Sequence, residues 1–384
     1  MKEFWPIVIL GFVGFVTSFG AHIVAVNLPV YAEQVGVGVA MIGLLISAYD
    51  LAEVVAKPLF GAVADRRGMK QTMLAGIGLF ILASLAYLWI DPRLLLLIRF
   101  LQGLGAAALS AVSLAMVGTY ITSQRGKAYG IYNAIKGAGY VISPIIGGAI
   151  VLQSSFATIF VAAAIVGGVA FGLSLLLPKP ESETSNALVD ADDEFSLSGF
   201  LMVFRESMLW PWYTITVVNM FFVGILFGFL PVRVHALGYN PLISGLLLSA
   251  VATSYLLVQP VAGMLADRIS PVLTIRIGLL LSGVCIVLAP FVNGFFLLMV
   301  SILAGIGVGT VWTNTDALIS GLAKSGKLGA TMGAAGSFKE LGDMLGPLLI
   351  GVVSQAFGLT IGFVSCGILG LLSVLMIPKR QVAK

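Results

Sequence analysis

The sequence predicts an all-α polytopic membrane protein with about twelve spanning helices in two related halves. Three observations lead to this prediction: a very apolar composition, a series of apolar stretches long enough to cross a bilayer, and an internal repeat. Hydrophobic residues make up 59% of the 384 residues, charged residues make up 10%, and the mean hydropathy is +1.06. Soluble domains carry about 25% charged residues, so lipid must be the solvent for most of this chain.

Twelve apolar stretches have the length that a bilayer requires, which is about 20 helical residues for a hydrocarbon core of about 30 Å. Six stretches precede a hydrophilic break and lie at 6–30, 39–64, 71–90, 93–120, 127–151 and 154–177. Six follow it and lie at 209–231, 241–266, 271–291, 294–320, 327–352 and 355–377. We therefore expect an N-terminal six-helix bundle over 1–177, a cytoplasmic linker over 178–208 and a C-terminal six-helix bundle over 209–384.

Several features exclude other classes of protein or site. The N-terminal apolar run from Phe4 is long and lacks a small-residue cleavage site, so it is expected to be the first span and not a removed signal peptide. Cys285 and Cys366 lie inside apolar runs, which is typical of small core residues and not of a disulfide or a metal pair. The net charge of +4 comes mostly from short loops between spans, so we expect no nucleic-acid partner.

The basic residues predict the orientation of the chain in the membrane. With the N-terminus in the cytoplasm, most Lys and Arg residues outside the spans fall on the cytoplasmic side, and only Arg93 and Arg233 fall on the other. This asymmetry is the positive-inside rule, and it places both termini in the cytoplasm. Trp5, Trp89, Trp210 and Trp212 stand at span ends, where aromatic residues gather at membrane interfaces.

The two halves share a repeat that keeps a nearly constant spacing. At an offset of 202 residues, five first-half residues recur in the second half, namely Leu28, Gly43, Pro58, Asp65 and Gly103, as Leu230, Gly245, Pro260, Asp267 and Gly305. At an offset of 203, Lys136 and Pro144 recur as Lys339 and Pro347. Six helices form an even number, so both halves have the same orientation, and such parallel repeats place a substrate site near the midplane between them.

Three motifs in this frame resemble those of the major facilitator superfamily. The run Gly61 to Lys70 (GAVADRRGMK) resembles the signature between helices 2 and 3, with a weaker copy from Gly263 to Arg268. The run Arg99 to Gly103 (RFLQG) on helix 4 is similar to a motif common among proton-coupled members. The glycines and proline of helix 5 resemble the antiporter motif, with Ser143 in place of a usual glycine; they are Gly130, Gly139, Pro144, Gly147 and Gly148.

The resemblance implies roles for these motif residues. Gly61, Asp65, Arg66 and Gly68 would form a conformational motif in which Gly68 permits a tight reversal and Asp65 engages neighbouring helix ends. The alternative is a charged loop that only fixes orientation. On helix 5, Gly139, Pro144 and Gly148 would give a bend and a close contact between the halves that takes part in coupling. Ordinary small-residue packing is the alternative there.

Ionisable residues inside the predicted spans are expensive, because each costs about 2.5–3.5 kcal/mol at a helix centre on insertion scales. We expect a wet cavity, mutual pairing, or both, and the candidates for proton coupling are Asp50, Glu53, Arg99, Lys136, Lys339, Glu340 and Asp343. Lys57 adds one more charge. Purely structural pairing is the alternative, since Glu53 with Lys57 and Lys339 with Asp343 are i,i+4 neighbours.

The resemblance implies a specific way in which the charges inside the predicted spans would couple proton and substrate movement. Asp50 lies about 11 residues into its span, hence about 16 Å deep at about 1.5 Å per residue, and Lys136 and Lys339 lie about as deep. Helices 2 and 11 face each other in the superfamily fold, so Asp50 and Glu53 would meet Lys339 in one state and lose it in another. A buried carboxylate that loses its cation binds a proton more readily.

The same resemblance places the substrate in a cavity lined by helices 1, 4, 7 and 10. The polar or aromatic residues on those helices are the candidate substrate contacts, namely His22, Asn27, Gln102, Asn219, Trp312, Asn314 and Asp316. Each of them could equally be a packed core residue.

The predicted function is secondary active transport, as proton-coupled efflux of drug-like or other small organic molecules by alternating access. The alternative is an exporter or proton symporter of a specific anionic metabolite, lipid or metal chelator, because Arg99, Lys136 and Lys339 put positive charge near the cavity. A membrane enzyme would need a metal cluster or nucleophile constellation, and a receptor would not need midplane charges. ATP-driven transport is disfavoured by the lack of a P-loop sequence.

The expected partners follow from this function. They are a small-molecule substrate, protons and the lipid bilayer. We expect no cofactor and no metal, a monomer, and a multi-pass location in the plasma membrane, here a bacterial inner membrane.

Overall fold

The computed structural model describes residues 4–27, 31, 36–89, 91, 94–120, 125–178, 207–323 and 328–377. Within this part of the chain there are twelve α-helices and no strand. The predicted linker over 178–208 lies almost wholly outside the described residues. The all-α fold predicted from composition and apolar periodicity is therefore confirmed.

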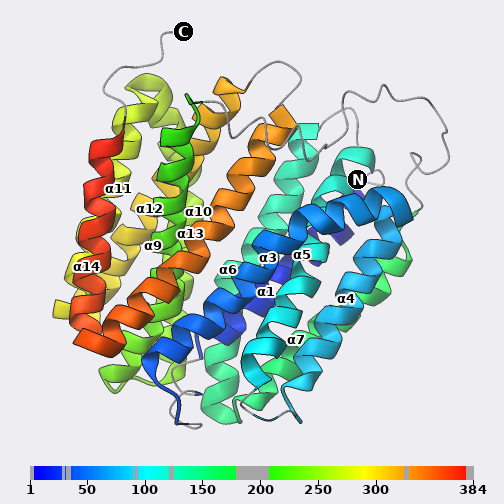
Figure 1. The fold of residues 1–384 in the computed structure, drawn as a ribbon, viewed down its shortest axis with the longest axis horizontal. Coiled ribbons are helices and arrows are strands. Elements are labelled where there is room, and N and C mark those ends of the chain that lie inside the picture. The colour runs from blue at the N-terminus through cyan, green and yellow to red at the C-terminus, as the bar shows by residue number, and fades with distance from the viewer. Residues whose placement is uncertain are drawn as a thin grey trace. The chain divides into compact units, whose positions relative to one another are not determined.

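The twelve helices follow one another along the chain (Figure 1). The first six are α1 (Trp5–Ala25), α3 (Val39–Arg67), α4 (Met69–Ala86), α5 (Leu95–Tyr120), α6 (Arg125–Gln153) and α7 (Ala157–Leu175). The other six are α9 (Trp210–Ala236), α10 (Pro241–Arg268), α11 (Pro271–Leu288), α12 (Gly294–Leu322), α13 (Leu328–Phe357) and α14 (Leu359–Leu372). Two short 3₁₀ helices, η3 (Ala289–Phe291) and η4 (Ser373–Met376), follow α11 and α14.

Eleven of these helices are long and apolar enough to cross a membrane. The twelfth, α13, has 30 residues but carries Lys339, Glu340 and Asp343 within two turns, which lowers its hydropathy. The chain is a multi-pass membrane protein, and twelve helices agree with the predicted count.

Several predicted span ends differ from the helices by a few residues, among them the following three. The span predicted to end at 231 continues to Ala236 with Pro231 inside the helix, because an apolar helix tolerates a proline whose freed carbonyl is satisfied by its surroundings. The boundary predicted between 352 and 355 lies instead at Gly358, whose φ of +90° ends one helix and begins the next. The third helix ends at Ala86, four residues before the predicted end.

The chain divides into two compact units. Unit 1 comprises residues 1–37, 44–188 and 238–249, and unit 2 comprises 38–43, 189–237 and 250–384. Each unit therefore includes the first residues of a helix whose remainder belongs to the other unit. The domain boundaries predicted at 177 and 209 stay a prediction.

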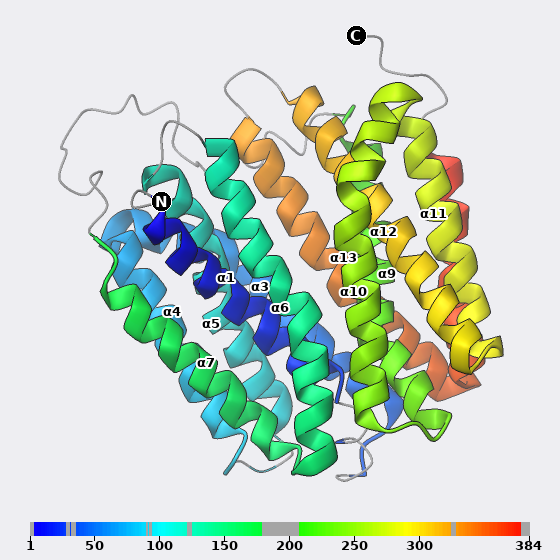
Figure 2. The ribbon, with the colours of Figure 1, turned by 180° about the vertical axis from the view of Figure 1, so that it is seen from behind.

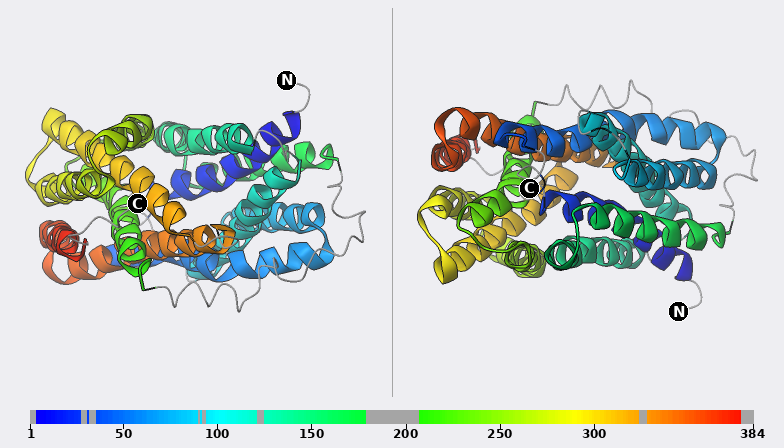
Figure 3. Two further views of the ribbon diagram at one scale, coloured as in Figure 1. Left: turned by 90° about the horizontal axis from the view of Figure 1, so that it is seen from above. Right: turned by 90° about the horizontal axis from the view of Figure 1, so that it is seen from below.

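Inside each unit the same helix pairs pack together (Figures 2 and 3). In unit 1, α1 packs along α6, and α4 packs along both α5 and α7. In unit 2, α9 packs along α13, and α11 packs along both α12 and α14. These pairings are first with fifth, third with fourth and third with sixth in both sets, so the packing repeats as the sequence does.

A basic side chain closes the end of the last helix in each set. In unit 1, the Lys70 ammonium donates hydrogen bonds to the carbonyls of Leu175 (2.8 Å) and Leu177 (2.5 Å). In unit 2, the Arg276 guanidinium donates to the carbonyl of Ile377 at 3.3 Å. Both cations stabilise carbonyls that have no intrahelical partner.

Candidate substrate and ion sites

Two acidic residues of α3, Asp50 and Glu53, are buried. Asp50 and Glu53 are 8% and 7% exposed. The Lys57 ammonium donates to a carboxylate oxygen of Glu53 at 2.8 Å, which confirms the local pair predicted from the i,i+4 spacing. Carboxylates at such depth need a cation, a hydrogen-bond donor or a proton to be stable.

Arg99 on α5 is the largest fully buried side chain of the structure and is 2% exposed. Its guanidinium donates to the side-chain oxygen of Gln102 at 2.8 Å and to the carbonyls of Leu45 and Ala21 at 3.3 Å each. The same group lies 4.4 Å from the centre of the Tyr49 ring. Among the described residues these neutral groups surround Arg99, so its charge is solvated by dipoles and a π face.

Gln102 ties this cluster to the neighbouring helix α4. Its amide nitrogen donates to the Ser84 hydroxyl at 2.9 Å, and that hydroxyl donates to the Phe80 carbonyl at 2.8 Å. The structure thus joins Arg99, predicted for proton coupling, with Gln102, predicted for substrate contact. Because every atom of the Gln102 amide is engaged within the protein, this residue holds the Arg99 guanidinium in place in the present structure.

The other candidates of unit 1 lie on α1 and α6, or just beyond α1. The His22 ring donates a hydrogen bond from Nδ1 to the Ser18 carbonyl at 2.8 Å and lies edge-on to Tyr140, with ring centres 4.5 Å apart. Asn27 is fully buried and donates to the Ile23 carbonyl at 3.0 Å. Lys136 is half-buried on α6.

In unit 2, Lys339 on α13 forms an ion pair with Asp316 on α12. The ammonium nitrogen lies 2.6 Å from one carboxylate oxygen, and the side chains are 19% and 27% exposed. The i,i+4 alternative predicted Asp343 as the partner, and this is wrong for the described structure. A carboxylate on the adjacent helix can approach the Lys339 ammonium more closely than a neighbour on the same helix surface. The predicted meeting of Lys339 with Asp50 or Glu53 in another state stays a prediction.

Lys339 also lies over an aromatic pair. Its ammonium is 5.0 Å from the centre of the Trp312 ring, and Trp312 stacks on Tyr255 with ring centres 5.9 Å apart and an angle of 6° between planes. A cation over an indole face gains electrostatic stabilisation. The Lys339 charge is therefore shared between a carboxylate and a ring, both on α12.

A small cavity adjoins this ion pair. Its volume is about 10 Å³, room for about one water-sized group, and its walls are Thr216, Asn219, Met220, Trp312, Thr315, Asp316 and Lys339. Pockets for drug-sized ligands measure about 300–1,000 Å³. The cavity in this structure therefore has room for a single small polar group and not for a whole drug-like molecule.

The predicted substrate contacts of unit 2 separate into two groups. Asn219, Trp312 and Asp316 line the cavity together. Asn314 is not among its lining residues, and its amide donates to the carbonyls of Thr310 (2.8 Å) and Ala262 (3.4 Å). Asn314 thus ties α12 to α10, which matches the packing alternative.

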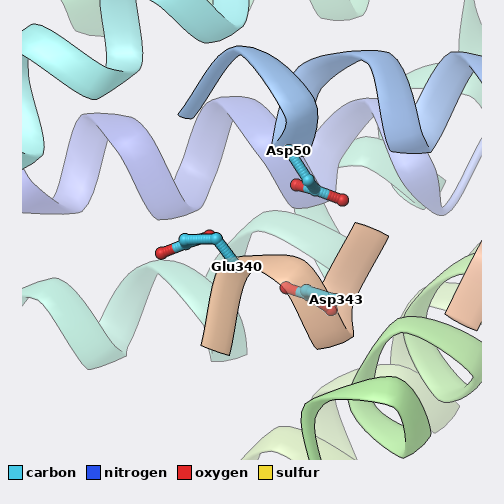
Figure 4. A group of neighbouring side chains, drawn as sticks. All are labelled: Asp50, Glu340 and Asp343. Atoms are coloured by element: carbon cyan, nitrogen blue, oxygen red, sulfur yellow. The ribbon is translucent and has the colours of Figure 1, made fainter. Parts of the chain in front are cut away.

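Two further acids lie on α13. Figure 4 labels Asp50 on α3 and shows Glu340 and Asp343 projecting from adjacent turns of α13. Glu340 and Asp343 are half-buried and lie within one turn of Lys339. Their proposed part in proton coupling stays a prediction.

The charged motif after α3 has the turn that the sequence predicted. Gly68 joins α3 to α4 with a φ of +95°, a left-handed conformation that favours glycine. Arg66 is exposed and Gly61 is half-buried. The side chain of Asp65 lies outside the described residues, so its role stays a prediction.

The motif of α6 makes close contacts inside unit 1. Gly139 packs against α1 at Ser18, and Gly148 packs against the backbone at Pro241, where α10 begins. A side chain at Gly245 would collide with the carbonyl of Pro144, which lies inside α6. These contacts lie within unit 1, and the part that the motif plays in coupling stays a prediction.

Unit 2 contains the repeat-related contact. A side chain at Gly43, in the first turns of α3, would collide with the carbonyl of Pro347 inside α13. Gly43 and Gly245 are related by the offset of 202, and Pro144 and Pro347 by the offset of 203. The same glycine-on-proline contact thus occurs twice.

Three cavity residues were missed in the sequence: Thr216, Met220 and Thr315. A spacing signal was available for them. Thr216, Asn219 and Met220 follow an i, i+3, i+4 pattern, and Trp312, Thr315 and Asp316 follow the same pattern on α12. Residues so spaced share one helix face.

The chain has clear relatives among known proteins. Residues 10–253 and 212–383 match the Major Facilitator Superfamily. The class G tetracycline resistance protein of Vibrio anguillarum is 27% identical over 330 residues, covering 83% of this chain and 80% of that protein. The multidrug resistance protein MdtL of Shigella flexneri is 28% identical over 371 residues, covering 95% and 93%.

The fold also matches solved structures. A crystal structure of the nucleoside transporter NupG (D323A mutant) superposes with a TM-score of 0.82 at 13% identity, covering 98% of this chain and all of that one. At this identity the likeness concerns the fold. With twelve helices, a repeated packing pattern and matches that span the chain, the protein belongs to the major facilitator superfamily and is a membrane transporter, not an enzyme.

Proposed function

We propose that this transporter exports drug-like or other small organic molecules in exchange for protons. The observation that carries the proposal is the presence of paired charges on spanning helices, above all Lys339 with Asp316 at 2.6 Å. Such groups are costly in lipid, and they are found where a transporter must bind and release charge. Glu53 with Lys57 supplies a second pair, in unit 1.

The proposed coupling uses the carboxylates as proton carriers. A buried carboxylate is stable while a cation faces it, and it takes up a proton when that cation moves away. Protonation then releases the cation, so the two binding events exclude each other. Coupled transport by alternating access requires that the two binding events exclude each other, because otherwise protons and substrate would each cross the membrane without the other.

The relatives support the direction of transport. Two of them are named for resistance to tetracycline and to multiple drugs, which a cell acquires by keeping a compound out. Their matches span most of both chains, and we extend efflux to this protein on that ground. We also propose a monomer in a bacterial inner membrane with both termini in the cytoplasm, as the basic residues predict.

The test is flux in proteoliposomes with and without a pH gradient. Tetracycline serves as the first probe, followed by a panel of amines. An imposed gradient should drive uphill accumulation of a transported compound, and collapse of the gradient with a protonophore should abolish it. Accumulation that is indifferent to the gradient would remove the antiport claim.

The carboxylates of α3 give the first testable prediction. The double variant Asp50→Asn, Glu53→Gln should lose gradient-driven accumulation but keep exchange of labelled for unlabelled substrate, because exchange moves no net proton. Asp91→Asn, at an exposed position between α4 and α5, is the control. Full gradient-driven transport in the double variant would exclude these residues as proton carriers.

A second candidate function is favoured by Arg99. Its described contacts are carbonyls, an amide and an aromatic ring, so the charge of this buried guanidinium is available to an anion. This feature supports export or proton symport of an anionic metabolite, lipid or metal chelator. A matched panel of carboxylates in the same proteoliposomes separates the two candidates, since an anion transporter would accumulate them and leave the amines outside.

A further inference from the structure

Three buried oxygen atoms without hydrogen-bond partners belong to residues that line the cavity of unit 2. They are Oδ1 of Asn219, Oγ1 of Thr315 and Oδ1 of Asp316. Asn219 and Thr315 are each 2% exposed. Buried polar atoms almost always form hydrogen bonds within the protein, because burial removes the water that would otherwise bind them. Three such atoms around one cavity indicate a site for a ligand that is absent.

The orientation of Asn219 is fixed by its own contact. The amide nitrogen donates to the Val308 carbonyl at 3.2 Å, and a carbonyl can only accept. The opposite assignment of the amide would set two acceptors against each other. The oxygen is therefore the atom left to serve the cavity.

The other two oxygens also have acceptor capacity. One carboxylate oxygen of Asp316 accepts from Lys339, and the second has no partner among the described residues. Thr residues inside helices commonly donate to a carbonyl one turn back, as Thr216 does to Trp212, but Thr315 makes no such bond here. The cavity thus offers a carboxylate oxygen, an amide oxygen and a hydroxyl, which together demand a ligand rich in donors.

We propose that this cavity binds the ammonium head group of an organic cation, which donates its N–H groups to these three oxygens. The proposal rests on the proposed function and names its substrate class. An ammonium has three donors and no acceptor, which matches the three oxygens. The cavity has room for about one water-sized group, which is the size of the ammonium nitrogen with its protons, and Met220 supplies an apolar wall beside it.

Lys339 is the built-in competitor of this ligand. Its own ammonium already occupies the other Asp316 oxygen and the Trp312 face, so the site demonstrably accommodates a cation. Two positive charges on one carboxylate repel each other, and binding of the ligand therefore weakens the hold of Asp316 on Lys339. Substrate binding and release of Lys339 are thereby linked.

The test is binding of three matched probes to the purified full-length protein. They are 2-phenylethylamine, its N,N,N-trimethyl derivative and 3-phenylpropionate, titrated at pH 7 by calorimetry in sodium-free buffer. We expect the primary amine to bind best, the quaternary cation more weakly because it has no N–H, and the carboxylate not at all. Equal binding of the primary and quaternary cations, or preference for the carboxylate, would overturn the proposal.

Three variants give a pattern that a purely structural role would not produce. Asp316→Asn and Asn219→Leu should each weaken amine binding by about tenfold to a hundredfold, the effect of losing one hydrogen bond to a charged group. Lys339→Met should strengthen amine binding by about tenfold, because the competitor is gone. Ser320→Ala, one turn beyond Asp316 on an exposed face of α12, is the matched control.

The remaining outcomes are also decisive. If Lys339→Met weakens binding together with Asp316→Asn, the pair is only a scaffold and the proposal fails. If no amine of the panel binds and sodium alone stabilises the protein in an Asp316-dependent way, the cavity is an inorganic cation site. If neither binds, water alone fills it.

Failure of this proposal is distinguishable from failure of the proposed function. Gradient-driven flux of a neutral or anionic compound, with no amine binding, would leave proton coupling intact and refute the ammonium site. Asp316-dependent amine binding without gradient-driven flux would retain the site and refute antiport.

Discussion

Two deeply placed cations are stabilised in different ways at the level of single residues. Arg99 is surrounded by carbonyls, an amide and an aromatic ring, whereas Lys339 has a carboxylate and an indole face. A guanidinium spreads its charge over a planar fork and holds its proton permanently, so dipoles can satisfy it. An ammonium concentrates its charge at one point, so it depends much more on a counter-charge.

The Lys339–Asp316 pair yields a prediction about stability. Asp316→Ala leaves the Lys339 ammonium without a counter-charge and should lower the free energy of unfolding by roughly 1–3 kcal/mol. This is less than the loss of about 3–5 kcal/mol for a fully buried pair, because the side chains of Asp316 and Lys339 keep 27% and 19% exposure. The double variant Asp316→Asn, Lys339→Met should recover most of this loss. Thermal unfolding in detergent measures both, and additive losses would show that the two residues do not interact.

Arg99 gives a second residue-scale prediction. Arg99→Lys keeps the charge but cannot reach Gln102 and the two carbonyls together, so it should lose roughly 1–3 kcal/mol of stability and most transport. Arg276→Lys is the matched control, since a lysine can still donate to the carbonyl of Ile377. Unchanged flux in Arg99→Lys would show that the fork geometry is irrelevant.

The candidate site was only partly predictable from the sequence. Charged residues such as Arg99 and Lys339 can be identified from the sequence, because charges are costly in lipid and are therefore rare in apolar runs. The ion-pair partner of Lys339 could not be predicted in this way. Lys339 and Asp316 are 23 positions apart, and their contact depends on how α12 and α13 pack. Thr315 carries no charge and is common in helices, so only its spacing from Asp316 points to the cavity.

At the level of helices, glycines set how closely two backbones approach. Gly245 lies against the Pro144 carbonyl in unit 1, and Gly43 lies against the Pro347 carbonyl in unit 2. A proline inside a helix leaves the carbonyl one turn earlier without its usual donor and bends the helix. A residue without a Cβ can then lie against the bent segment, as small residues do in membrane helix packing.

This contact predicts the effect of adding a side chain. Gly245→Val would place its Cβ within the Pro144 carbonyl, so α10 must move away from α6, and both thermal stability and transport should fall. Gly168→Ala is the control, because a Cβ at that position of α7 meets no atom within 4 Å. Wild-type unfolding temperature in Gly245→Val would contradict the close approach.

Helix existence was easier to predict than helix ends. Apolar length alone identified all twelve helices, because lipid leaves the backbone no alternative to internal hydrogen bonds. Ends depend on single residues whose effect is conditional. Pro231 reads as a stop yet lies inside α9, whereas Gly358 reads as ordinary packing yet separates α13 from α14.

At the level of the whole chain, the internal repeat determines both packing and topology. First with fifth, third with fourth and third with sixth helices pack in both units, as a duplicated sequence requires. An even number of helices in each repeat leaves the two copies with one orientation. The prediction that both termini lie in the cytoplasm follows from this count together with the basic loops.

Topology can be measured with single cysteines. In a variant lacking Cys285 and Cys366, which are both buried, a cysteine placed at either terminus should resist an impermeant maleimide in intact cells and react after lysis. A cysteine at Asp91, in the connection between the third and fourth helices, should react in intact cells. The reverse pattern would invert the orientation.

The composition of α13 has a consequence for how the protein is made. Helices leave the translocon according to their own affinity for lipid, and a lysine or aspartate near the centre costs about 2.5–3.5 kcal/mol in that step. Lys339 is matched by Asp316 on the helix synthesised just before it. We therefore expect these two helices to enter the bilayer as a hairpin, and a nascent chain lacking Asp316 to retain α13 in the insertion channel.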